Sequence, residues 1–375
     1  MSSGYRKHSR FCFELATPED SQELLEILEG APFEGKISLC YTRRPDAYRS
    51  LKKEGADVAI VVCRDLKQRR IVGFGACVIR TLLVNGNAAN VGYLFGLRMR
   101  PEYFKKYPML HHGYEFLHTL HKEQGVSFYI TTILEENRYV QKLLEEHRPF
   151  MPTYQPFGMY EVYVLKTKVT PTSSSFANIN LRQATQNDLF ALLRFLSENG
   201  RNYQFFPVIE EQDLRAGRIS GITVEDFYLL CGVQNEILAT GVLWDQRTYK
   251  QYLVKSYGGL LKLLYPFSRL FPLFGFPALP APGSILNFST LSFWAVKGNN
   301  PELFRHFLDS IVSLSGEYPF FLIGVHERHP LRDMLQKRPH ISYKSKLYLV
   351  SWNEQQEYVD KLDHHMVPYL ECGML

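Results

Sequence analysis

Histidines are the first candidates for chemistry in this chain, because imidazoles on one helix face can bind a metal ion. Four of them lie close together: His111, His112, His118 and His121. His118 and His121 are three residues apart, which suits one helix face, but we find no acidic or cysteine partner at ligand spacing. Five histidines of the second half are scattered along the sequence: His326, His329, His340, His364 and His365. The sequence therefore predicts a solvated helix face and no metal.

Cysteine usage points to a reducing compartment. The six cysteines form no CxxC pair: Cys12, Cys40, Cys63, Cys77, Cys231 and Cys372. We expect reduced, mostly buried thiols in a cytoplasmic protein. The N-terminal residues lack the apolar core of a signal peptide, and no run of 18 apolar residues predicts an integral membrane segment.

The overall composition is that of a globular protein. The chain has 375 residues with 45% hydrophobic and 22% charged residues, and its net charge of +5 is mild. No dense stripe of Lys and Arg accompanies that charge, so we predict no nucleic-acid partner.

Strand and helix patterns alternate in the first half. Thr17 is a good N-cap for a helix that follows the first strand and ends at Gly30. Strands are predicted over 11–16, 57–63, 71–84, 89–99, 126–134 and 160–165, and helices over 17–29, 46–54, 108–123 and 137–146.

An internal repeat indicates that this order occurs twice. Ala16–Asp20 and Ala184–Asp188 start alike at an offset of 168, and Pro101–Phe104 and Pro301–Phe304 match at an offset of 200. In the second half, strands are predicted over 179–184, 227–233, 237–244, 285–296, 320–325 and 342–352, and helices over 186–199, 301–315 and 331–336.

The repeat divides the chain into parts. We predict a first domain over 1–166, a polar linker over 167–178, a second domain over 179–352 and a tail over 353–375. An apolar insertion over 258–283 accounts for most of the larger offset. It could be a helical hairpin packed on the second domain, a lid or acyl-group pocket, or a contact with a membrane or another protomer. The tail could lie across the first domain or form a homodimer contact.

The order of these elements resembles the GNAT superfamily of acyl-CoA N-acyltransferases, present twice in tandem over residues 10–166 and 178–352. The resemblance implies an α/β (α+β) fold of two GNAT-like domains. Each would hold a mixed, mostly antiparallel sheet flanked by helices.

In that family the fourth strand leads into a Gly-rich turn that binds the CoA pyrophosphate at a helix N-terminus. In the first half, Lys105 and Lys106 replace those glycines, and Pro108 can open the helix. In the second half, Val296–Pro301 departs further from the signature. The resemblance therefore implies that acetyl-CoA or another acyl-CoA binds in the first half. The cofactor-binding candidates are Leu97, Arg98, Met99, Lys105, Lys106, Tyr107 and Asn137.

The resemblance also implies catalytic candidates. Asn137 matches the Asn that opens the helix after the fifth strand, but the family's Tyr acid falls at Leu143 or Leu144. Tyr139, one turn away, is the substitute acid. Glu135 is the base candidate, with Glu136 beside it, and the backbone N–H groups near Leu97–Met99 would hold the oxyanion.

The leading hypothesis is an N-acyltransferase that moves an acetyl or other acyl group to an amine of a small molecule or peptide. The second half would be a degenerate copy that shapes the substrate cleft. A non-catalytic binding or scaffolding protein is an alternative, since the Gly-rich turn and the Tyr are missing. Another is an aminoacyl-tRNA-dependent transferase, although no basic arm or coiled-coil hairpin for tRNA is visible.

Overall fold

The computed structural model describes residues 10–30, 32, 36–104, 109–146, 148–167, 178–268, 279–314 and 316–375. Two predicted features therefore lie outside the described residues: the basic turn at 105–108 and all but the ends of the linker. Six cysteines lie within the described residues; all six are free and five are buried, as predicted.

The first half contains the predicted order of strands and helices, plus one further strand, β2. Its elements are β1 (Phe11–Leu15), α1 (Ser21–Glu29), β2 (Ile37–Thr42), α2 (Ala47–Lys52), β3 (Asp57–Asp65), β4 (Arg70–Val84), β5 (Asn87–Met99), α3 (Leu110–His121), β6 (Phe128–Leu134), α4 (Arg138–Glu145) and β7 (Thr153–Lys166).

The second half repeats the order with additions that were not predicted. Its elements are β8 (Asn180–Gln183), α5 (Leu189–Gly200), β9 (Tyr203–Gln204), α6 (Glu211–Arg215), β10 (Phe227–Cys231), β11 (Ile237–Trp244), β12 (Gln251–Tyr257), α7 (Gly259–Leu264), β13 (Ser289–Val296), α8 (Pro301–Leu314), β14 (Phe320–His326), α9 (Arg332–Gln336), β15 (His340–Ser351), α10 (Gln356–Asp360) and β16 (Val367–Pro368).

The repeated start has the same physical basis in both halves. Thr17 and Asp20 form a capping box before α1, and Thr185 and Asp188 form the same box before α5. Each box satisfies two backbone N–H groups that a helix start leaves without partners. The short sequence match therefore marks the same local structure twice.

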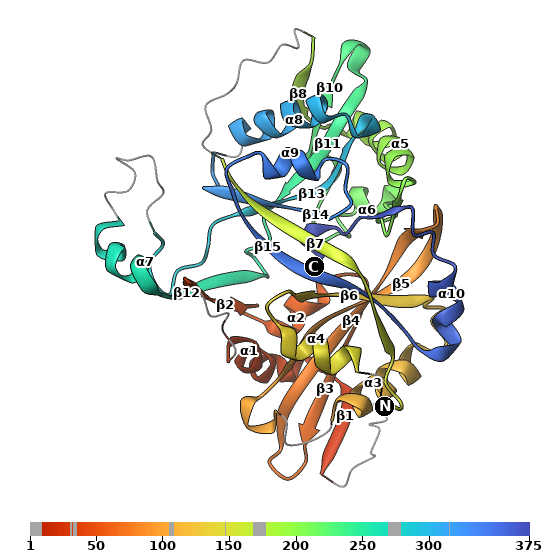
Figure 1. Cartoon of the computed structure of the whole chain (residues 1–375), viewed down its shortest axis with the longest axis vertical. Coiled ribbons are helices and arrows are strands. Elements are labelled where there is room, and N and C mark those ends of the chain that lie inside the picture. Colours follow the sequence, from red (N-terminus) through yellow and green to blue (C-terminus); the bar gives the residue numbers. More distant parts are fainter. Residues whose placement is uncertain are drawn as a thin grey trace.

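One continuous sheet of twelve strands runs through the described part of the molecule (Figure 1), in the order β1-β3-β4-β5-β6-β15-β7-β14-β13-β11-β10-β8. All its pairs are antiparallel except β5/β6 and β13/β14. Buried apolar clusters lie under the helices, for example Leu24 and Leu28 of α1 and Phe304 and Phe307 of α8. These features confirm the predicted mixed, mostly antiparallel sheet flanked by helices.

The two halves exchange their last strands. β15, from the second half, pairs with β6 of the first half, and β7, from the first half, pairs with β14 of the second. β7 and β15 also pair with each other over most of their length, from His340↔Leu165 to Ser351↔Thr153. The strand patterns predicted both closing strands but not this exchange.

A second link between the halves is a two-stranded sheet of β2 and β12, with Cys40 opposite Leu253. The C-terminal tail forms a third link. β16 pairs with β9, the hydroxyl of Tyr160 donates to the backbone oxygen of Leu370 (2.9 Å), and Arg80 donates to that of Met374 (2.9 Å). The tail therefore packs between the halves.

The described part of the insertion does not form the helical hairpin packed on the second domain that was one interpretation of the sequence. In its described part, Leu260 of α7 is 69% exposed and Leu263 is 71% exposed. Figure 1 shows α7 projecting from the body of the molecule. Residues 269–278 of the insertion lie outside the described residues.

Candidate functional site

The candidate site begins where two parallel strands separate. β5 and β6 pair only at Val91↔Phe128, Gly92↔Tyr129 and Tyr93↔Ile130, and both strands continue beyond the last pair. On its other side, β5 bulges against β4, so that Gly96 and Leu97 both lie opposite Gly75. Gly96 has a φ of +68°, which glycine adopts without steric cost. The bulge and the separation together open a gap in the sheet.

A cavity of about 810 Å³ occupies this gap and the space behind it. One end is apolar and lies between the sheet and α3, where its lining includes Val61, Met109, Leu117 and Ile133. Leu143 and Leu144 of α4, at the position where the family's Tyr was expected, also line the cavity. Apolar pockets with few polar groups are typical of ligand sites.

The other end of the cavity is polar and contains residues of both halves. Tyr93 and Arg43 come from the first half, and Lys250, Tyr252 and Tyr343 come from the second. Burial raises the pKa of Tyr93 to about 12, so its hydroxyl stays protonated, and it lies 3.2 Å from the Thr132 hydroxyl. Sequence reasoning missed these residues, because the pairing of β2 with β12 and of β15 with β6 brings them together.

A buried charge cluster supports this polar end. The Glu54 carboxylate forms ion pairs with Arg43, with Arg80 (3.6 Å) and with Lys250 (3.8 Å). Burial lowers the pKa of Lys250, and its Nζ donates to the backbone oxygen of Leu375, which also lines the cavity. Lys250 thus links the second half to Glu54 of the first, and Arg80 links the tail to the first half.

Five of the predicted site residues line the cavity: Leu97, Arg98, Met99, Asn137 and Tyr139. Asn137 caps α4 by accepting from the Val140 N–H (3.4 Å), and the Tyr139 ring packs on Phe104 at the mouth. Glu135 is exposed at the end of β6 and is not among the lining residues. Lys105, Lys106 and Tyr107 lie outside the described residues.

The equivalent gap in the second half is filled. β13 and β14 pair only at Ser289↔Phe321 and Thr290↔Leu322 before they separate. Beyond the last pair, Trp294 of β13 packs on Phe304 of α8, with ring centroids 5.2 Å apart. The remaining pocket is only about 30 Å³, enough for roughly one or two water molecules.

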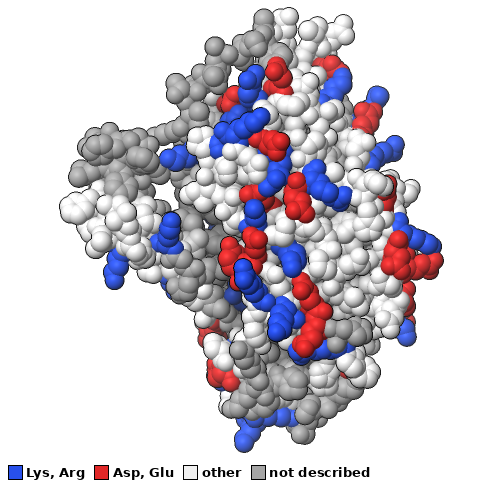
Figure 2. Space-filling model, viewed as in Figure 1, with Lys and Arg blue, Asp and Glu red and all other residues white. Residues whose placement is uncertain are grey.

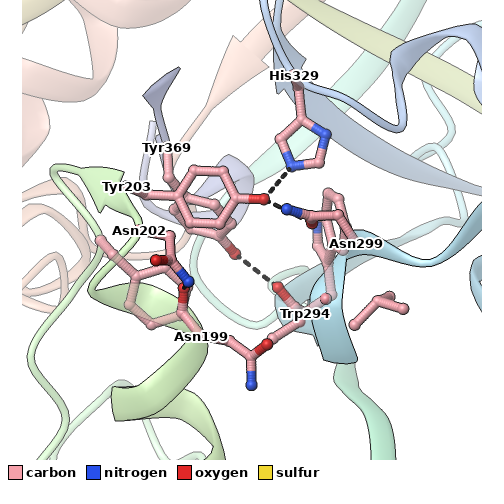
Figure 3. A pocket seen from close by; sticks show the side chains of 11 residues that line it. Asn199, Asn202, Tyr203, Trp294, Asn299, His329 and Tyr369 are labelled. Carbon is pink, nitrogen blue, oxygen red and sulfur yellow. Dashed lines mark hydrogen bonds between the residues drawn. The ribbon is translucent and has the colours of Figure 1, made fainter. Parts of the chain in front are cut away.

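Hydrogen bonds fix the residues that fill this second gap (Figure 3). The Leu331 N–H donates to Nδ1 of His329 (3.1 Å), so the ring proton belongs on Nε2. Nε2 lies 3.1 Å from the Tyr203 hydroxyl, which in turn donates to Asn299 (2.7 Å). Burial lowers the pKa of His329 to about 3, so the ring is neutral. Of these two gaps, the first is the one open to a ligand.

Comparison with known proteins bears on the fold. No protein-family model matches the sequence, and no curated protein matches it. Among solved structures, Saccharomyces cerevisiae N-myristoyltransferase with bound myristoyl-CoA matches with a TM-score of 0.60 and 10% identity, over 93% of this chain and 84% of that chain.

Two other solved structures match with lower scores. A probable N-acyltransferase from Enterococcus faecalis matches with a TM-score of 0.52 and 10% identity, over 94% of this chain and 75% of that one. A GCN5-related N-acetyltransferase from Anabaena variabilis matches with a TM-score of 0.52 and 12% identity, over 91% and 72%.

The chain has the GNAT fold. Since each match covers more than nine-tenths of the chain, the likeness includes both halves. The open gap lies between β5 and β6 of the first half, and the oxyanion candidates Leu97–Met99 line the cavity behind it.

The described residues contain neither a metal-binding group nor a membrane-spanning helix. No group of three or more His, Cys, Asp or Glu side chains there could hold a metal ion. In the same residues, no helix has both the length and the apolar character needed to cross a bilayer.

Proposed function

We propose that this protein is an acyl-CoA N-acyltransferase that transfers an acyl group from a CoA thioester to an amine. One observation carries the proposal: in a GNAT fold, the sheet opens between β5 and β6 onto a cavity of about 810 Å³, while the equivalent gap of the second half is filled. The second half then serves to complete the cavity.

In this proposal, the thioester arm of CoA enters between β5 and β6. The peptide groups of Leu97–Met99 would bind it and hold the developing oxyanion, because backbone N–H groups already in place need no reorganisation during the reaction. Lys105 and Lys106 are proposed to bind the CoA phosphates, and Asn137 is proposed to position the arm.

The apolar end of the cavity favours an acyl group longer than acetyl. Its lining of Val61, Met109, Leu117 and Ile133 would release water on binding methylene groups. The polar end, with Tyr93, Tyr252 and Tyr343, would receive the acceptor amine of a small molecule or peptide.

For proton transfer, we propose Tyr139 as the acid that protonates the leaving thiolate, because it is at the cavity mouth and carries an O–H donor. Glu135 lies beside the cavity rather than in it, so as a base it would act through intervening water. Glu135→Gln tests that role, with Glu136→Gln as the neighbouring control.

A ligand series tests the proposal. Thermal unfolding of the full chain is measured with CoA, acetyl-CoA and acyl-CoAs of increasing length, since a ligand that binds the folded state raises the Tm. Acyl transfer to a panel of amines is measured by the amount of free CoA thiol that the reaction releases. We expect the longer acyl-CoAs to give the larger Tm shifts.

Leu117→Trp adds bulk to the apolar end and should move the preference toward short acyl chains. Thr119→Trp, on the exposed side of the same helix α3, is the matched control. A flat Tm response to every thioester, without thiol release, would contradict the proposal and favour a binding or scaffolding module.

A further inference from the structure

An exposed apolar arm extends from the second half beside the candidate site. We define the arm as residues 255–268, which comprise the end of β12, α7 and the residues that follow it. Its exposed apolar side chains are Leu260 (69%), Leu263 (71%), Leu264 (37%) and Phe267 (62%). Their spacing of i, i+3, i+4 and i+7 places them on one face of a helical segment. That face has no cover from the described part of the chain.

The charge of the arm has one sign. Residues 255–268 contain two lysines and no Asp or Glu. On the arm itself, Lys255 and Lys262 are exposed. The backbone oxygen of exposed Lys36 accepts from the Gly258 N–H (3.0 Å), so a third lysine lies at the base of α7.

Elsewhere on the surface, charged side chains of both signs are mixed. Figure 2 shows positive and negative side chains interspersed over the body, whereas the charged side chains drawn in colour on the projecting lobe are blue in this view. An apolar helical face flanked by lysines matches a bilayer with anionic headgroups, because the apolar side chains enter the acyl boundary while the lysines meet the negative surface.

We propose that this arm docks on the surface of an anionic phospholipid bilayer. The partner is a lipid surface rather than a second copy of the chain, because a two-fold contact would bring the same lysines of both copies together. The proposal is independent of the proposed function, since it concerns where the protein binds and not what it transfers.

Vesicle sedimentation of the full chain tests whether the arm docks on an anionic bilayer. We expect the protein to sediment with vesicles of phosphatidylcholine plus phosphatidylglycerol, and much less with phosphatidylcholine alone. Phe267→Ser should lower the partition coefficient roughly tenfold, because it removes one large inserted side chain. Phe190→Ser on α5 is the matched control: Phe190 is 65% exposed, and α5 lies on the other side of the molecule in Figure 1.

A charge-reversal variant measures the electrostatic contribution to vesicle binding. Lys262→Glu should weaken binding to the anionic vesicles, whereas Lys67→Glu, with the same change in net charge at the β3–β4 turn, should not. Unchanged Tm values verify that the variants fold. Equal binding of Phe267→Ser and the parent would overturn the proposal. So would a dimer in ultracentrifugation that Phe267→Ser dissociates, which would assign the arm to self-association.

Discussion

Tyr139 combines a position at the cavity mouth with a ring held by Phe104, with centroids 5.2 Å apart. Its side chain is 44% exposed, so its hydroxyl can meet both solvent and a molecule bound in the cavity. We predict that Tyr139→Phe lowers kcat by about 10²-fold, the usual contribution of a positioned acid. The control is Tyr358→Phe, an exposed tyrosine of α10. Equal kcat values for both variants would exclude Tyr139 as the acid.

Two buried histidines predict how stability changes with pH. Burial lowers the pKa of His326 to about 4 and that of His329 to about 3, from an ordinary 6.5. The unfolded chain therefore binds protons below pH 6.5 that the folded chain does not bind. Their contribution to stability is fully present above pH 6.5 and is lost as the pH falls toward 4 and below, at a limiting slope of about 1.4 kcal/mol per pH unit for each histidine.

Urea unfolding between pH 7 and pH 4 measures this slope. His329→Gln should be less stable at pH 7 and should show a shallower loss on acidification, because one titrating group is gone. His365→Gln, an exposed histidine, is the control. A parent whose stability does not fall between pH 6.5 and pH 4 would contradict the assignment of neutral, buried rings.

At the residue scale, sequence reasoning reached those cavity-lining residues that are local in sequence. Leu97–Met99 and Asn137 were found because each follows a recognisable strand or starts a helix. Arg43 and Lys250 were not found, because no local pattern says that β2 will pair with β12 and bring these cations to one carboxylate. Glu135 was placed correctly at a strand end, but the sequence could not show that its side chain lies outside the cavity.

The β5 bulge is the element that opens the first gap. Gly96 holds a φ of +68°, where a Cβ costs about 1–2 kcal/mol. We predict that Gly96→Ala lowers the free energy of unfolding by about that amount and weakens acyl-CoA binding. Gly75, opposite it in the same bulge, has an ordinary φ, and a Cβ there would lie 3.6 Å from Leu97. Gly75→Ala should therefore change stability little, and equal losses for the two variants would contradict this account.

Strong periodicity explains which elements were predicted. The long strands β3 and β5 and the amphipathic helices α1 and α8 carry enough residues for a clear pattern. β9 and β16 have two residues each and form only through tertiary pairing, so no sequence pattern could predict them. The sequence left the surroundings of the α7 leucines open between a packed hairpin, a lid and a contact surface, because an apolar helix pattern does not tell which surface covers it.

For the whole molecule, the exchange of last strands predicts that the halves need each other. Without residues 178–375, β6 would lose β15 and present an unpaired edge. We predict that a fragment ending at Ser174 and one beginning at Ser175 are each poorly folded alone but form a folded complex when mixed. Near-ultraviolet circular dichroism and cooperative unfolding measure this.

The control is the intact chain treated in the same way. Two fragments that unfold independently, each with its own cooperative transition and no gain on mixing, would contradict the requirement for exchange. The domain boundaries stay a prediction. The twelve-stranded sheet runs without a break from the first half into the second.

The same exchange sets the order of events during synthesis. β6 ends at Leu134, and the strand that must lie beside it begins at His340, about 200 residues later. At roughly 5–20 residues per second, a ribosome needs on the order of 10–40 s to make that stretch. During that interval, the cavity lacks the Tyr343 and Ser345 side chains of β15. A nascent chain therefore cannot complete this cavity until translation is nearly finished, and stalling after the linker should leave an aggregation-prone intermediate for chaperones.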